Sequence, residues 1–133
     1  MKIIRDFPPN YDQIAAVFDI RGRRGIVFTY GDTIYAPHSS RALPEHLKIH
    51  ERTHIRQQGN DPAGWWKEYI NNASFRLGQE VAAYRRQYKF FINHNHNIKE
   101  QKQFLESITK DLSSEMYGNV ISQEGARALI LGY

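Results

Sequence analysis

Cysteine is absent from the 133 residues, and this absence removes several kinds of chemistry at once. Disulfides, thiolate metal ligands and cysteine nucleophiles are all excluded. Long apolar runs are also missing: the first residues, MKIIRDFPPNYDQ, hold no stretch of secretory length, and no later segment approaches a membrane span. We therefore expect a soluble, cytoplasmic protein with no membrane partner, in which histidine and carboxylate side chains hold any metal ion.

Acidic side chains are the minority, with 14 Asp and Glu against 18 Lys and Arg, which gives a formal net charge of +4. The basic residues are scattered along the chain, for example RGRR at 21–24 and Arg85 with Arg86. Scattered charges are typical of a solvated surface, whereas nucleic-acid binding usually needs a dense basic stripe or a reader motif. The sequence shows neither feature, so we do not expect nucleic acid as a partner.

The length fits one domain around one core, and we expect residues 1–133 to form a single α+β domain. Three apolar segments in the first third favour strands: residues 14–20 (IAAVFDI), 26–30 (IVFTY) and 33–36 (TIYA). The turn sequences RGRRG and GD separate them, which predicts a small antiparallel sheet of about three strands. Residues 33–36 would then offer an open edge to an extended peptide.

From about residue 43 the apolar period becomes helical. Leu43, Leu47, His50 and His54 follow one another at i, i+4, i+7 and i+11, which places all four on one face of a helix. The two histidines therefore continue the apolar stripe and should point inward with it. This helix is expected at the centre of a mainly helical bundle on which the sheet packs.

Further helices are predicted by their start signals and periodicity. Asp61 before Pro62 reads as the N-cap of the next helix, which carries the two tryptophans. A long helix is expected from about 72 or 74 to 91, and an amphipathic one over 98–112. Ser122 is a candidate N-cap for a last short helix.

The sequence HERTH at residues 50–54 carries a recognisable chemistry. Histidines four apart on a helix can aim their imidazoles at one point, and zinc takes such nitrogens at about 2.0–2.1 Å. Glu51 lies one residue round the helix, where its carboxylate can activate a metal-bound water as general base. This is the HExxH signature of metallopeptidases. The alternative is a structural histidine pair, whose buried rings would need hydrogen-bond partners.

A third metal ligand has to come from a carboxylate. The pattern HExxHxxGxxH is excluded, because this chain has Gln57 and Asn60 where that pattern has glycine and histidine. Three acidic residues follow within reach: Asp61, Glu68 and Glu80.

Among these acids, Glu80 is the favoured ligand. Asp61 is better explained as a helix cap, and Glu68, beside Lys67 on a short helix, is expected to be solvated. Glu80 lies in the weakly charged, partly apolar segment RLGQEVAAY on the long helix. Its alternative role is an ion pair with Arg76, four residues earlier.

HERTHIRQQ, followed about two dozen residues later by RLGQEVAAYRRQ, resembles gluzincin-type HExxH metallopeptidases. It is particularly similar to small metallopeptidase domains found in bacteriophage and bacterial genomes, over roughly residues 33–87. The resemblance implies one zinc ion (Zn²⁺) per chain held by His50, His54 and Glu80, with Glu51 as catalytic base. It also implies a peptide or protein substrate and, for a phage-encoded protein, a place in the host cytoplasm.

Two tyrosines are candidates for stabilising the oxyanion that forms during hydrolysis. Tyr84 follows Glu80 by one helical turn, and Tyr117 precedes Gly118 at an expected turn. A tyrosine at such a position is more often a core aromatic with a hydrogen-bonded hydroxyl, which is the alternative interpretation of each.

The sequence as a whole therefore favours a zinc-dependent hydrolase that cleaves peptide bonds. One alternative is a non-catalytic, zinc-stapled protein, in which the ion only holds the fold together and the protein has a structural or interaction role. The same resemblance implies that such a protein would be phage-encoded. Another is a basic nucleic-acid-binding protein.

Overall fold

A computed structural model describes residues 1–132, and this part of the chain has the expected α+β fold, with six α-helices and a three-stranded sheet. The strands are β1 (Lys2–Ile4), β2 (Phe28–Tyr30) and β3 (Thr33–Tyr35). The helices are α1 (Tyr11–Ala15), α2 (Glu45–Gln58), α3 (Pro62–Asn71), α4 (Ala73–His94), α5 (Ile98–Leu112) and α6 (Gln123–Leu131); a short 3₁₀ helix, η1 (Glu115–Tyr117), precedes α6.

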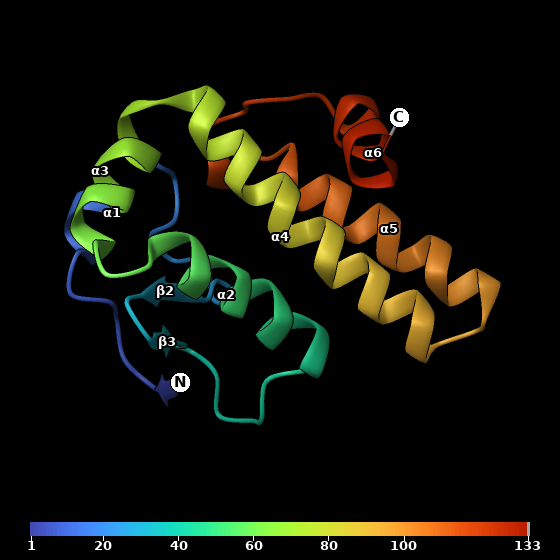
Figure 1. The fold of residues 1–133 in the computed structure, drawn as a ribbon, viewed down its shortest axis with the longest axis horizontal. Coiled ribbons are helices and arrows are strands. Elements are labelled where there is room, and N and C mark those ends of the chain that lie inside the picture. Colours follow the sequence, from blue (N-terminus) through green and yellow to red (C-terminus); the bar gives the residue numbers. More distant parts are fainter. Residues whose placement is uncertain (133) are drawn as a thin grey trace.

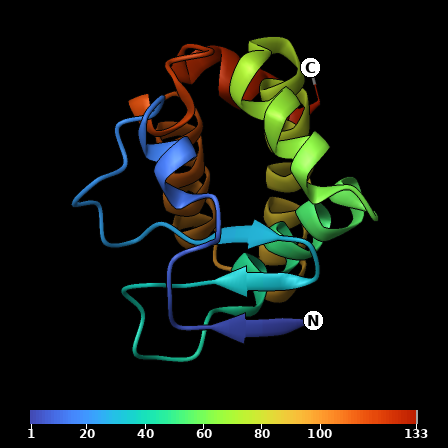
Figure 2. The same ribbon diagram turned by 90° about the vertical axis from the view of Figure 1, so that its left-hand side faces the viewer.

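Helix α2 lies between the sheet and the long helix α4 (Figures 1 and 2). It packs against β2 on one side and against α4 on the other, while α3 contacts both helices. Helices α5 and α6 pack against α4 and against each other. The helix that carries HERTH is therefore central, as predicted, and its side chains meet neighbours from both layers.

The sheet is mixed, where an antiparallel sheet was expected. Its strand order is β1-β3-β2, with β1 parallel to β3 and β2 antiparallel to β3. Strand β3 is thus the central strand and pairs on both sides. The prediction that this segment presents an open edge to a substrate peptide is therefore wrong.

The predicted strand at residues 14–20 is also wrong, because this segment begins with helix α1 and continues as turns. Ile14 and Phe18 are four residues apart and both buried, whereas Ala16, which a strand would place on the same face as both, is exposed. That burial pattern follows a helical turn and not the alternation of a strand. The third strand is instead β1, whose three residues are all exposed.

The later helices begin where their capping residues predict. The Asp61 side chain accepts a hydrogen bond from Gly64 N at 3.0 Å, and Ser122 caps α6 in the same way from Gly125 N. Helix α2 starts at Glu45 and has no side-chain cap. The buried Leu43, which was expected on this helix, therefore lies just before it. Of the helices in residues 1–132, none combines the length and apolarity that crossing a membrane requires.

Candidate metal centre

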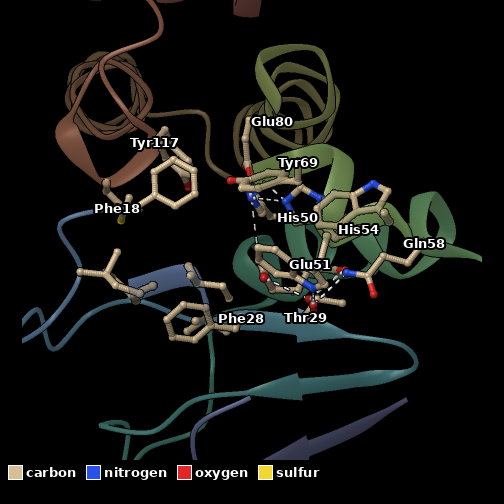
Figure 3. Close-up of a pocket in the computed structure, with 17 residues that line it drawn as sticks. Phe18, Phe28, Thr29, His50, Glu51, His54, Gln58, Tyr69, Glu80 and Tyr117 are labelled. Carbon is tan, nitrogen blue, oxygen red and sulfur yellow. Dashed lines mark hydrogen bonds and ion pairs between the residues drawn. The ribbon is translucent and has the colours of Figure 1, made fainter. Parts of the chain in front are cut away.

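His50 and His54 of α2 and Glu80 of α4 form a compact buried cluster (Figure 3). The Nε2 atoms of the two imidazoles are 3.2 Å apart. Glu80 Oε1 lies 3.1 Å from Nε2 of His50 and 3.2 Å from Nε2 of His54. The three residues are between 3% and 5% exposed. The structure thus brings together the residues that the sequence singled out, close enough to bind one metal ion.

The size of this triangle fits a metal ion. Donor atoms about 2.0–2.1 Å from a tetrahedral ion lie roughly 3.3–3.4 Å from each other. The three observed separations, 3.1 to 3.2 Å, are close to that value and nearly equal. Two imidazole nitrogens and one carboxylate oxygen are also a donor set that zinc and similar divalent ions accept.

The far side of each imidazole ring is held by a glutamine. Nδ1 of His50 lies 2.9 Å from Gln87 Oε1, and Nδ1 of His54 lies 2.7 Å from Gln57 Oε1. An amide oxygen only accepts hydrogen bonds, so each Nδ1 carries the proton. In the neutral rings, both Nε2 lone pairs then face the Glu80 carboxylate. Three electron pairs converge on one point, which requires a proton or a cation between them.

The pKa values of the cluster reflect this convergence. Burial acts to lower the pKa of His54, but the facing Glu80 carboxylate and the hydrogen bond to it raise the pKa to about 9. Burial acts to raise the pKa of Glu80, yet the charge of His54 and the hydrogen bonds from both imidazoles hold it well below the usual carboxyl range. The carboxylate therefore stays ionised, as a metal ligand must be.

Glu51 lies beside the triangle and not within it. Its Oε1 accepts a hydrogen bond from the Thr29 hydroxyl at 3.1 Å, while Oε2 is 3.6 Å from Nε2 of His50. Burial is the largest influence on this carboxyl and raises its pKa. A buried carboxylate with a raised pKa, held next to a metal-binding cluster, can accept a proton from a reacting water molecule.

Tyr69 is a member of the site that sequence reasoning missed. Its hydroxyl donates a hydrogen bond of 2.7 Å to Glu80 Oε2, which leaves Oε1 to the two imidazoles. Tyr69 lies on the apolar face of α3 beside the tryptophans, where the pattern predicts only core packing. No spacing in the sequence indicates this contact, because it depends on how α3 crosses α4.

The two tyrosines predicted to stabilise an oxyanion lie together near the cluster. The hydroxyls of Tyr84 and Tyr117 are 2.8 Å apart, and the Tyr84 ring packs edge-on against His50 with ring centroids 4.4 Å apart. Burial raises the pKa of both hydroxyls, so both stay protonated and able to donate. Their catalytic role stays a prediction.

A small cavity of about 50 Å³ opens beside the cluster (Figure 3). One wall consists of the polar cluster together with Glu51. The facing walls are apolar and come from the segment after α1, from β2 and from η1. These apolar lining residues include Phe18, Ile20, Ile26, Phe28 and Met116. Glu51 therefore faces a space that is bounded mainly by apolar side chains.

The other candidate acids lie elsewhere, as expected. Asp61 caps α3, and Glu68 is exposed on that helix, where it accepts a hydrogen bond from Asn72. Arg76 does not pair with Glu80; its guanidinium donates to the main-chain carbonyls of Tyr69 and Tyr117 instead.

Gln58, at the end of α2, is a second residue that the sequence reading missed. Its Oε1 accepts from Gly31 N and its Nε2 donates to Thr29 O, both at 2.8 Å. These bonds tie α2 to the strand whose Thr29 side chain holds Glu51. The signal was present: Glu51 and Gln58 are seven residues apart, and so lie on the same side of the helix.

Comparison with known proteins identifies no relative: no protein family matches the chain, and no curated protein or solved structure matches it significantly.

Proposed function

We propose that this protein is a zinc-dependent hydrolase that cleaves peptide bonds. The observation that carries the proposal is the triangle of His50, His54 and Glu80 with Glu51 buried beside it. The separations suit one divalent ion per chain, and the donor set of two imidazoles and one carboxylate is typical of catalytic zinc. Such sites keep one coordination position open for water or substrate.

Each side chain then has a task. A bound zinc ion supplies Lewis-acid activation of water and of the substrate carbonyl. Glu51, held by the Thr29 hydroxyl, takes the proton of the attacking water molecule and passes it to the leaving amine. The paired hydroxyls of Tyr84 and Tyr117 are the nearest candidates for donating to the oxyanion. A peptide or protein substrate is supported by the resemblance of the motifs to HExxH metallopeptidases.

The test combines metal content with one conservative variant. The purified protein should contain about one zinc per chain, measured by elemental analysis, and should cleave a peptide library. Glu51→Gln keeps the shape of the side chain but removes its basicity. It should retain zinc and lose roughly 100- to 10,000-fold in hydrolysis. Unchanged hydrolysis by the Glu51→Gln protein would rule out the proposed base.

A second candidate function is a zinc-stapled structural or interaction protein without catalysis. The observation that favours it is the burial of the whole cluster at 5% exposure or less, which leaves little access for a polypeptide substrate in this conformation. A closed, four-ligand metal sphere without a water position would support this function. X-ray absorption at the zinc edge distinguishes the two coordination spheres.

A further inference from the structure

Gln87 is buried behind His50, on the side of the ring that faces away from the metal-binding triangle. It lies on α4, two turns after Glu80, and is 4% exposed. Its Oε1 is 2.9 Å from Nδ1 of His50. One helix face therefore supplies both the carboxylate in front of the imidazole and the amide behind it.

The orientation of this amide is set by a third histidine of α2. Gln87 Nε2 lies 2.9 Å from Nδ1 of His46, one helical turn before His50. The His46 ring packs edge-on against Phe91 and Phe104, with ring centroids 5.7 and 4.9 Å away. In the neutral ring Nδ1 can accept a hydrogen bond from the amide nitrogen. The amide oxygen is then directed at His50.

This orientation selects the form of His50 that can bind a metal ion. Because the Gln87 oxygen only accepts, the proton of neutral His50 stays on Nδ1, and the Nε2 lone pair faces Glu80 and His54. A metal-bound histidine usually donates its other N–H to such a partner, which fixes both the ring and the tautomer.

His54 has a comparable but more local partner. Gln57 lies three residues further along the same helix, and its Nε2 donates to the main-chain oxygen of Gln79 at 3.0 Å. That carbonyl fixes the direction of the Gln57 amide. Within residues 1–132 the Gln87 amide has no such main-chain anchor, so its direction depends on His46.

We propose that Gln87, oriented by His46, is a positioning residue for metal binding: it holds His50 in the tautomer and direction that the ion requires. This inference rests on the metal binding of the proposed function but not on peptide hydrolysis. It predicts that a change at Gln87 alters metal affinity and ligand geometry even where the fold is intact.

The experiment compares Gln87→Leu and Gln87→Glu in the full chain. Zinc affinity is measured by competition with a chromophoric chelator, and ligand geometry by the visible absorption spectrum of the cobalt-substituted protein. Gln87→Leu keeps the side-chain volume but cannot accept a hydrogen bond, and should bind zinc roughly 10- to 100-fold more weakly, with a shifted cobalt spectrum. Gln87→Glu still accepts from Nδ1 of His50 and should therefore bind zinc roughly 10- to 100-fold more tightly than Gln87→Leu.

A role in packing alone predicts the reverse order, because leucine fills the buried site whereas glutamate brings a charge into it. His46→Phe keeps the aromatic packing and removes the acceptor, so it should weaken zinc binding by a smaller factor than Gln87→Leu. Combining it with Gln87→Leu should add no further loss, because both changes break one chain of contacts. Gln103→Leu, on the exposed side of α5, is the matched control.

Wild-type affinity and an unchanged cobalt spectrum in Gln87→Leu would overturn the inference, and so would a wild-type protein that binds no zinc. If Gln87→Leu does not fold, the other two variants test the inference. His46→Phe must then bind zinc more weakly than Gln87→Glu does. Zinc binding that follows the predicted order in a protein without peptidase activity would remove the proposed function and leave this inference standing.

Discussion

At the scale of single residues, a proton and a metal ion compete for the same place. His54 has a pKa raised to about 9 because the Glu80 carboxylate faces it, so the metal-free ring is protonated at neutral pH. The proton on Nε2 lies where the nitrogen lone pair has to meet the ion. Metal binding therefore has to displace a proton, and it should tighten as the pH rises.

The same raised pKa makes the stability of the metal-free protein depend on pH. The folded-state pKa of His54 lies above its ordinary value of 6.5, so its contribution is fully present below pH 6.5 and is lost as the pH rises to about 9. We predict that the free energy of unfolding falls by about 3 kcal/mol across this window. Urea denaturation at several pH values, with chelator present, measures it.

Glu80 contributes with the opposite sign. Its pKa lies below the ordinary value of 4.5, so its contribution is present above that pH and is lost only in stronger acid. Glu80 therefore does not cause the decline between pH 6.5 and 9, and a His54 variant separates the contribution of His54 from that of Glu51, whose pKa is also raised by burial. A His54→Gln protein should lack most of this slope, and an unchanged slope in that variant would contradict the assignment.

Residues of the site differ in how far the sequence could reveal them. His50, Glu51 and His54 are adjacent in one helical turn, so their spacing alone places them together. The proximity of Glu80 followed from eliminating the other acids and from its apolar surroundings. Tyr69 could not be found in this way, because its contact with Glu80 is created by the crossing of two helices. The same holds for Thr29, which reaches Glu51 from a strand.

At the scale of elements, helix α2 contacts a different neighbour on each of its two sides. The side with His50 and His54 faces α4, and the side with Glu51 and Gln58 faces β2. A small rotation of this helix would change both the metal-binding triangle and the position of Glu51, the proposed catalytic base. The contacts of Gln58 with β2 resist that rotation at the end of the helix.

We therefore predict that Gln58→Leu destabilises the protein by about 1–3 kcal/mol, because it leaves the part-buried Gly31 N–H without its acceptor. The carbonyl of Thr29 keeps its second donor, Trp66 Nε1 at 2.9 Å, which limits the loss. Urea denaturation measures the change. Gln103→Leu, on an exposed face of α5, should change stability by no more than about 0.5 kcal/mol and serves as control. Equal stability of the two variants would show that Gln58 does not anchor the helix.

Elements were predictable where local signals and burial agree. Helices α3 and α6 begin after Asp61 and Ser122, whose side chains cap them, and α5 covers the predicted residues 98–112. The segment 14–20 misled because its composition favours strand while its burial follows a helical turn. The three residues of strand β1 are all exposed, so the strand shows no alternation of buried and exposed side chains. Only its pairing with β3 defines it as a strand.

At the scale of the whole molecule, the candidate metal centre adds to a core that exists without it. One buried apolar cluster joins α1, β2 and α3, and a second joins α4, α5 and α6. Neither cluster depends on a metal ligand for its contacts. The candidate ion would link α2 to α4, two helices that already pack against each other. This arrangement favours a catalytic ion over a structural one, because the fold does not need the ion to bury its apolar surface.

Chelation provides the corresponding test. Zinc at about a thousand times its dissociation constant stabilises the folded state by roughly 4 kcal/mol, which for a chain of this size corresponds to a rise in Tm of about 10–15 °C. Excess chelator should therefore lower the Tm by that amount yet leave the far-ultraviolet circular dichroism at 25 °C unchanged. In Glu80→Gln, which lacks the anionic ligand, the Tm should respond far less to chelator. Loss of helical signal at 25 °C on chelation would instead show that the metal holds the fold together, and would favour the zinc-stapled alternative over the hydrolase.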